Sequence, residues 1–204
     1  MSMERKEPLF KNPIESNDGL SIDDLNKYLP AINKIEDLSM TANQMRDGLF
    51  LGLAIDGIKK IPNDSIDIII TEPPESPSQD INDSRKPITI QKYFEWNKNW
   101  LKESSRILKQ TGGIYLICGW KHSGMYQSLL NSFLKIQTRI TWRNSSPKGQ
   151  TSPLTWINRT SDIWFATKSD EFMFNQEAVT DETNNTKSNG PLELGVTNLW
   201  SDIM

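Results

Sequence analysis

The sequence predicts an α/β fold, in which helices alternate with the strands of a mostly parallel sheet. Short runs of β-branched and aromatic residues are separated by longer segments whose apolar residues have helical spacing. The two kinds of segment alternate along the chain, which favours right-handed strand–helix–strand crossovers. With 204 residues, 36% of them hydrophobic, the chain is long enough for one domain with its own core.

The first 62 residues predict an arm followed by short elements. Residues 1–20 are polar and read as a loose arm. Residues 21–40 predict one or two short helices, with Ser21 as the N-cap and a break at Pro30. Residues 48–54 predict a short strand and turn, and a segment of helical spacing then leads to the turn signal Pro-Asn-Asp.

A strand and a helix are predicted next. The nearly all-apolar run SIDIIIT, Ser65 to Thr71, is typical of a strand covered on both faces of a parallel sheet. A polar loop follows, and then a segment from Thr89 with apolar residues at helical spacing. The pair Gly112 and Gly113 is expected to end that helix as its C-cap.

The remaining elements continue the alternation. Residues 113–118 predict a second buried strand, and residues 122–134 a second helix. Residues 135–142 and 160–168 predict two further strands, separated by a loop rich in Pro, Gly, Ser and Asn. We expect three regions: an N-terminal arm with short helices over 1–47, an α/β domain over 48–175, and a polar, flexible tail over 176–204.

Charge is segregated along a chain whose net charge is −3. The stretch 104–161 has no Asp or Glu, and its bases are Arg106, Lys109, Lys121, Lys135, Arg139, Arg143, Lys148 and Arg159. Acids dominate the residues that follow. Such a chain can present a basic face to phosphate, although bases spread around a solvated surface fit the composition equally well.

Composition also limits the class of protein. There is no apolar run near twenty residues, and the N-terminus lacks the apolar core of a secretory signal. One cysteine, Cys118, and one histidine, His122, argue against a disulfide framework and a zinc site. We therefore expect a cytoplasmic protein with no metal and no membrane partner.

The tetrad Glu72-Pro73-Pro74-Glu75 follows the predicted strand directly. The two prolines fix two φ angles and remove two N–H donors, so the stiff backbone offers carbonyl acceptors beside a carboxylate. In parallel sheets, sites lie at the carboxyl ends of strands. The tetrad therefore suits a ligand that presents an NH2 group, such as a nucleobase amine; the alternative is a strand end with solvated carboxylates.

The order of these segments resembles the amino-group DNA methyltransferases, the N6-adenine and N4-cytosine family of restriction-modification systems. The resemblance rests on GLFLGLAIDGIKKIPNDSIDIIITEPPE, WLKESSRILKQTGGIYLICGW, RITWRNSSPKG, NRTSDIWFATKSDEFMFN and TNLWSDI, and runs from about Gly48 to Ile203. It implies a Rossmann-like methyltransferase fold of three αβα layers, present in partial form. It also implies S-adenosylmethionine as cofactor and DNA as partner.

In that family, an Asp-Pro-Pro-Tyr tetrad binds a base flipped out of the duplex. The resemblance implies that Glu72 takes the acceptor role, that Pro73 supplies a carbonyl acceptor and that Pro74 holds the turn. Glu75 stands where the family has an aromatic ring that stacks on the base. The reaction implied is direct transfer of a methyl group to the exocyclic amine of adenine (N6) or cytosine (N4).

Four departures from the family pattern leave the activity open. Glu72 is one methylene longer than Asp, Glu75 replaces an aromatic residue, and Leu53 stands where the family has Asp. The cofactor motifs that follow TNLW in this branch of the family do not appear, so no cofactor-binding residue is predicted. The sequence fits a fragment of a longer enzyme, one half of a split enzyme, or an inactive relative that serves as a DNA-binding or accessory subunit.

A second candidate site is the loop 144–155. Arg139, Arg143, Lys148 and Arg159 flank it or lie in it, with Trp142 and Trp156 interleaved. Basic and aromatic residues in a loop at a sheet edge predict contact with DNA, and a surface hairpin with core-facing tryptophans is the alternative. Because an incomplete sheet has an open edge, we expect a homodimer or a second polypeptide that completes the fold.

Overall fold

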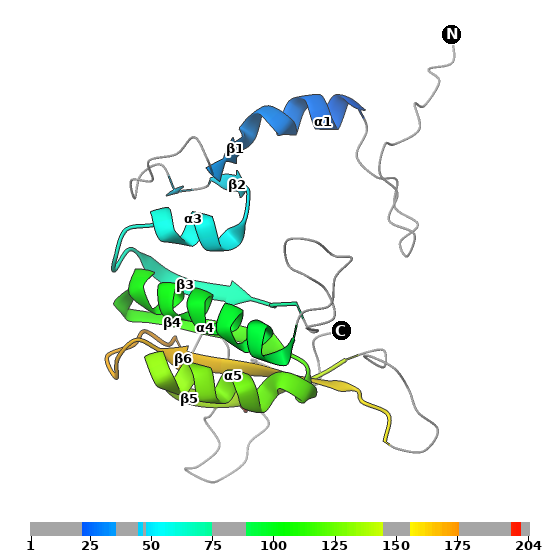
Figure 1. The fold of residues 1–204 in the computed structure, drawn as a ribbon, viewed down its shortest axis with the longest axis vertical. Coiled ribbons are helices and arrows are strands. Elements are labelled where there is room, and N and C mark those ends of the chain that lie inside the picture. Colours follow the sequence, from blue (N-terminus) through cyan, green and yellow to red (C-terminus); the bar gives the residue numbers. More distant parts are fainter. Residues whose placement is uncertain are drawn as a thin grey trace, which may run out of the picture. The chain divides into compact units, whose positions relative to one another are not determined.

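The computed structural model describes residues 22–35, 45–46, 48–74, 89–144, 156–175 and 197–200. The chain divides into two compact units, Met1–Pro62 and Asn63–Met204. Figure 1 shows their elements. The three regions expected from composition, with boundaries at 47/48 and 175/176, remain predictions.

The first unit pairs two short parallel strands. Its elements are α1 (Ile22–Tyr28), the 3-10 turn η1 (Leu29–Ala31), β1 (Ile32–Lys34), β2 (Leu49–Leu51) and α3 (Ala54–Lys60). The predicted break at Pro30 is confirmed, because the α-helix gives way there to the 3-10 turn. The predicted strand β2 and helix α3 are also confirmed. Strand β1 was not predicted; it pairs with β2, with Ile32 opposite Leu49.

The second unit is built on a five-stranded sheet with the order β3-β4-β6-β5-β7. Its strands are β3 (Ile66–Thr71), β4 (Leu108–Cys118), β5 (Lys135–Arg143), β6 (Thr160–Thr167) and β7 (Leu199–Trp200). Strands β3 and β4 are parallel, and β6 lies antiparallel between β4 and β5. The predicted α/β fold is confirmed. The inserted antiparallel strand explains why β5 runs in the same direction as β3 and β4.

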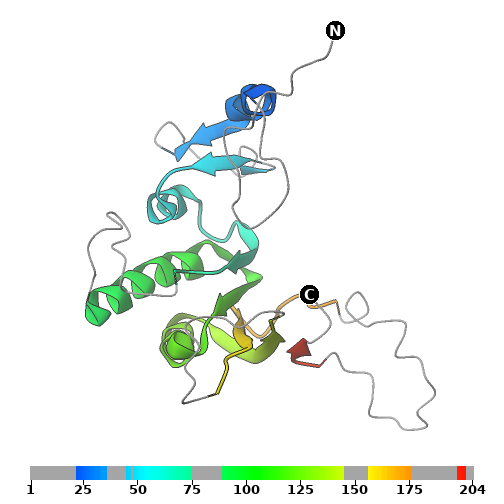
Figure 2. The same cartoon turned by 90° about the vertical axis from the view of Figure 1, so that its right-hand side faces the viewer.

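Helices α4 (Ile90–Ile107) and α5 (Trp120–Phe133) cover one face of this sheet, as Figures 1 and 2 show from two directions. Thr89 caps α4, because its side chain accepts a hydrogen bond from the backbone N–H of Lys92 at 3.2 Å. The core lies between sheet and helices. Its fully buried side chains include Leu101, Leu108, Ile114, Leu116 and Leu130.

The opposite face of the sheet is largely open around β3. Ile68 and Ile70 are 54% and 68% exposed, so the prediction of a strand covered on both faces is wrong for the described structure. Their neighbours on this face are the stacked rings of Tyr115 and Phe165, whose centroids are 4.5 Å apart. Within the second unit, the described residues thus form the sheet and one layer of helices.

Gly112 and Gly113 lie inside β4, so the prediction that they end a helix is wrong. Helix α4 ends at Ile107, and the chain enters the strand at once. A Cβ atom at Gly112 would lie 2.9 Å from the backbone oxygen of Asp67 on the neighbouring strand. The pairing of β3 with β4 also shifts register here. The glycines therefore permit a close strand approach at an irregularity.

Among the described residues, no helix is both long enough and apolar enough to span a membrane.

Candidate active site

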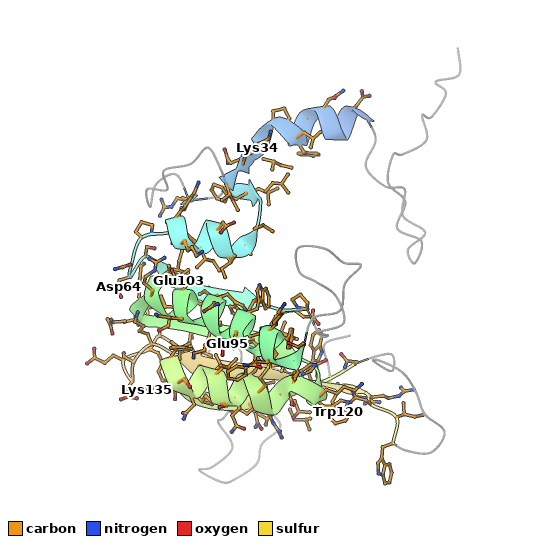
Figure 3. The ribbon with its side chains drawn as sticks, viewed as in Figure 1. Lys34, Asp64, Glu95, Glu103, Trp120 and Lys135 are labelled. Carbon is orange, nitrogen blue, oxygen red and sulfur yellow. The ribbon has the colours of Figure 1, made fainter. Side chains whose placement is uncertain are left out.

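The carboxyl ends of three parallel strands meet at one edge of the sheet. These ends are Thr71 of β3, Cys118 of β4 and Arg143 of β5. Helix α5 starts at the same edge with Trp120, which is 61% exposed. Figure 3 shows Trp120 at the end of the sheet opposite Asp64 and Lys135, which lie at the amino ends of β3 and β5. The predicted position of the site at this edge is thereby supported by the strand directions.

Glu72, Pro73 and Pro74 continue β3 beyond its last hydrogen-bonded residue. Glu72 and Pro74 are exposed, whereas Pro73 is buried. The carbonyl oxygen of Pro74 accepts a hydrogen bond from the hydroxyl of Tyr93 on α4. A side chain of helix α4 therefore holds the end of the proline pair in place. Glu75, the last member of the predicted tetrad, lies outside the described residues.

Tyr93 belongs to a cluster of buried polar side chains that is hydrogen-bonded to this turn. Tyr93, Asn97 and Tyr126 are 0%, 0% and 1% exposed. The Tyr126 hydroxyl lies 3.0 Å from Oδ1 of Asn97, to which it can donate, and 3.0 Å from the hydroxyl of Tyr93. Oδ1 of Asn97 also accepts from the indole N–H of Trp100 at 2.9 Å, and its Nδ2 donates to the backbone oxygen of Tyr93 at 2.8 Å.

Helical spacing explains how the cluster forms. Tyr93, Asn97 and Trp100 follow one another at intervals of four and three residues, so they share one face of α4. Burial, reinforced by the hydrogen bond with Tyr93, raises the pKa of the Tyr126 phenol above its ordinary value. Burial and the hydrogen bond with Tyr93 outweigh the opposite effect of the hydrogen bond with Asn97, so Tyr126 keeps its proton.

Trp100 is a core residue, with 6% exposure. The sequence had not indicated Tyr93 or Asn97 as parts of a site. The available signal was an asparagine on the apolar stripe of a helix, which a buried position tolerates only with hydrogen-bond partners. His122, considered a capping or surface residue, is half-buried, and its ring centroid lies 5.2 Å from that of Tyr93.

The predicted DNA-contact residues separate into two groups. Arg143 ends β5, and Arg159 directly precedes its partner strand β6, so both exposed residues lie at the edge that carries Glu72. Trp156 is 94% exposed. Arg139 lies further back along β5, with its Nε 3.8 Å from Oδ1 of Asp162, which partly offsets its charge. Lys148 lies outside the described residues.

Two further sequence expectations can be compared with the structure. Cys118 is 3% exposed at the end of β4, which confirms a small buried residue. Leu53 precedes α3 as its N-cap position and is 50% exposed, and its side chain makes no capping hydrogen bond. Within the described ranges, no cluster of three or more His, Cys, Asp or Glu side chains is arranged to hold a metal ion.

Comparison with known proteins identifies the class. A family model described as DNA methylase, for N6 and N4 methyltransferases, matches residues 66–202. This match spans more than half of the chain, and the chain belongs to this DNA methylase family. The type II methyltransferase M.HpaI of Haemophilus parainfluenzae is 31% identical over 138 residues, which are 66% of this chain and 43% of that protein.

Other relatives and solved structures agree. The type II methyltransferase M.MjaVI of Methanocaldococcus jannaschii is 32% identical over 101 residues, 45% of this chain and 52% of that protein. The PvuII DNA methyltransferase (cytosine-N4-specific) aligns with a TM-score of 0.56 at 15% identity, over 74% of this chain and 55% of that one. The fold is therefore that of the Rossmann-like, S-adenosylmethionine-dependent methyltransferases, as predicted.

A third structure extends this likeness. TTHA0409 of Thermus thermophilus, in complex with S-adenosyl-L-methionine, aligns with a TM-score of 0.52 at 13% identity, over 75% of this chain and 65% of that one. The chain spans about half the length of the relatives it matches, with 43%, 52% and 43% of their residues aligned.

The residues at the edge fit one side of a methyl transfer. A carboxylate and backbone carbonyls are acceptors that suit an amine, and Glu72 with the two prolines supplies them. An open groove on the uncovered face, lined by residues that include Asp67, Ile68, Tyr115 and Phe165, does not include Glu72. We therefore assign no residue of this chain to the cofactor.

Proposed function

We propose that the protein is a DNA methyltransferase that transfers a methyl group from S-adenosylmethionine to the exocyclic amine of adenine (N6) or cytosine (N4). The observation that carries this proposal is the Glu72-Pro73-Pro74 turn at the carboxyl end of β3, with its last carbonyl tied to Tyr93. Membership of the DNA methylase family supports it. Cytoplasmic location forms part of the same proposal.

The chemistry assigned to this chain concerns the amine. Bound S-adenosylmethionine supplies an electrophilic methyl group. The amine of a nucleobase is a poor nucleophile because its lone pair is delocalised into the ring. Hydrogen bonds from the amine to the Glu72 carboxylate and the Pro73 carbonyl would localise that lone pair and orient it. The amine nitrogen would form its bond to the methyl carbon as the sulfur–carbon bond breaks, S-adenosylhomocysteine would leave, and the proton lost by the amine would pass by way of the Glu72 carboxylate to solvent.

A matched pair of variants tests the role of Glu72. Glu72→Gln keeps the size of the side chain but replaces one acceptor oxygen by a donor, so we expect kcat to fall by about a hundredfold. Glu95→Gln makes the same change at an exposed position on α4 and should leave kcat unchanged. Transfer of labelled methyl from S-adenosylmethionine to unmethylated duplex DNA of mixed sequence, with any native partner present, is the measurement. Absence of transfer by the wild type would refute the proposed activity.

A second candidate function is an inactive methyltransferase-like subunit that binds DNA or assists an active enzyme. It is favoured by the longer Glu72 side chain, since displacement by about one ångström can cost a hundredfold in rate. It is also favoured by Glu75, which replaces a stacking ring with a charge. This function predicts salt-dependent DNA affinity without methyl transfer. Activity gained by Glu72→Asp combined with Glu75→Tyr would indicate a decayed site.

DNA is the proposed partner at the carboxyl edge. Arg143 and Arg159 are exposed there, and we include Arg139 and Lys148 in the contact surface with smaller and undescribed roles, respectively. Trp120, exposed at the start of α5, is the aromatic surface that we propose to stack on the extruded base in place of a ring at position 75.

We further propose that the open face of the sheet is covered when the protein acts. The cover would be polypeptide corresponding to the part of the relatives that lies outside the match, and a second copy of this chain is the competing outcome. The exposure of Ile68 and Ile70 on an edge strand supports this. Ile70→Lys should change the free energy of unfolding by less than about 0.5 kcal/mol yet abolish methyl transfer. A larger loss of unfolding free energy would show that the face is already packed.

A further inference from the structure

A chain of hydrogen-bonded groups runs from the buried cluster to the proline pair. Its oxygens, in order, are those of Asn97 Oδ1, Tyr126, Tyr93 and the Pro74 carbonyl. The two ends of this chain are pure acceptors, and the two phenols supply one proton each. Three contacts therefore share two protons, and each end receives one, because Tyr93 donates to Pro74 and Tyr126 donates to Asn97.

Trp100 shows which atom of Asn97 is the acceptor. An indole N–H can only donate, so the atom of Asn97 that lies 2.9 Å from it must be the amide oxygen. Tyr126 donates to the same oxygen, and Tyr93 donates to the Pro74 carbonyl. Oδ1 of Asn97 therefore has a second donor, whereas loss of the Tyr93 hydroxyl would leave the Pro74 carbonyl without this one, and an acceptor left without a donor in a part-buried contact is costly.

We infer that Tyr93, which donates to the Pro74 carbonyl while Tyr126 donates to Asn97, is a positioning residue for the Glu72-Pro73-Pro74 turn. The ring of Pro74 fixes its φ, and the hydrogen bond to its carbonyl fixes the remaining backbone angle ψ. Tyr93 therefore orients the peptide that follows the proline pair. This inference rests on the proposed function for its effect on methyl transfer, but not for the hydrogen bond itself.

Two variants of equal size separate positioning from packing. Tyr93→Phe removes the donor to Pro74, whereas Tyr126→Phe removes a neighbouring buried hydroxyl and leaves that donor in place. We expect kcat to fall about tenfold or more in Tyr93→Phe, with the KM values for DNA and S-adenosylmethionine within about twofold of wild type. Tyr126→Phe should keep kcat within about threefold, because the orientation of the turn is retained. Urea unfolding of both variants checks that they lose similar stability.

A direct readout does not depend on activity. Pro74–Glu75 is the one Pro–Glu pair in the sequence, so labelling proline carbonyl carbons with 13C and glutamate nitrogens with 15N yields a single carbonyl–amide resonance. Loss of the hydrogen bond should move the Pro74 carbonyl resonance upfield in Tyr93→Phe and much less in Tyr126→Phe.

The outcomes are distinct. Equal movement of the resonance in both variants, or movement in neither, overturns the inference. Movement in Tyr93→Phe alone, with kcat unchanged in an active protein, overturns the role of Tyr93 in methyl transfer. If the wild type transfers no methyl group, the proposed function fails, and the carbonyl resonance alone decides whether Tyr93 positions the turn.

Discussion

Replacement of Asn97 by Leu gives a stringent test of the buried cluster. Leu has the same branched arrangement of side-chain heavy atoms, so the change removes hydrogen bonds without opening a cavity. Three bonds of 2.8, 2.9 and 3.0 Å are lost, to the Tyr93 carbonyl, from the Trp100 indole and from the Tyr126 hydroxyl. At about 1 kcal/mol each, they account for about 3 kcal/mol, and the unpaired indole N–H adds about 1 to 3 kcal/mol. Apolar burial of the leucine side chain returns about 1 to 2 kcal/mol.

The expected net loss is therefore about 2 to 5 kcal/mol in the free energy of unfolding, a large share of a typical domain's stability. Urea unfolding followed by tryptophan fluorescence measures it. All seven tryptophans lie in the unit Asn63–Met204, so the signal reports this unit alone. The slope of unfolding free energy against urea should not change, because the same surface is exposed.

Ser104→Ala is the matched control on the same helix. Ser104 is 1% exposed, and its hydroxyl is the one buried side-chain polar atom of the described residues without a hydrogen-bond partner. Its removal relieves a desolvation cost, so stability should stay equal or rise by up to about 1 kcal/mol. The reasoning is refuted if Asn97→Leu costs less than about 1 kcal/mol, or if Ser104→Ala costs as much as Asn97→Leu.

Three further predictions concern the close strand approach at Gly112 and the exposed residues at the carboxyl edge of the sheet. Gly112→Ala should lower the urea midpoint by an amount equivalent to about 1 to 3 kcal/mol, because its Cβ would meet a backbone oxygen. Arg143→Gln combined with Arg159→Gln should lower the slope of log K for DNA binding against log salt concentration by the amount expected for about two phosphate contacts, as measured by fluorescence titration. Arg139→Gln should lower this slope by less. Trp120→Ala should weaken binding of a 2-aminopurine duplex by about 1 to 3 kcal/mol without changing stability.

Helices α4 and α5 and strands β3, β5 and β6 were predictable because their signals are local, whereas β7 lies in the region expected to be a polar tail. The apolar stripe of α4 and the run from Ile66 to Thr71 each show the period of their element within a few residues. The location of Glu72 at the carboxyl edge follows from the same local signal, and its role in a site stays a prediction.

What the sequence did not predict depends on contacts between distant segments. Gly112 resembles a helix C-cap in the sequence, and only the approach of Asp67, 45 residues earlier, shows why glycine is needed inside a strand. The antiparallel strand β6 between β4 and β5 is likewise a matter of non-local pairing. The hydrogen bond between Tyr126 and Asn97 joins two helices 29 residues apart, which no helical period encodes.

Strand β3 contributes both to the open face of the sheet and to the carboxyl edge that carries Glu72. Ile70 precedes Glu72 by two residues, about 7 Å along an extended chain, so polypeptide that covers Ile70 also lies near the carboxylate. In the proposed function, the chain's own residues supply acceptors for the amine, and none was assigned to the cofactor. Polypeptide on the open face would therefore be placed to contribute to the cofactor side of the site. Completion of the sheet and completion of the site are then the same event, which is why we expect Ile70→Lys to abolish methyl transfer while leaving the fold intact.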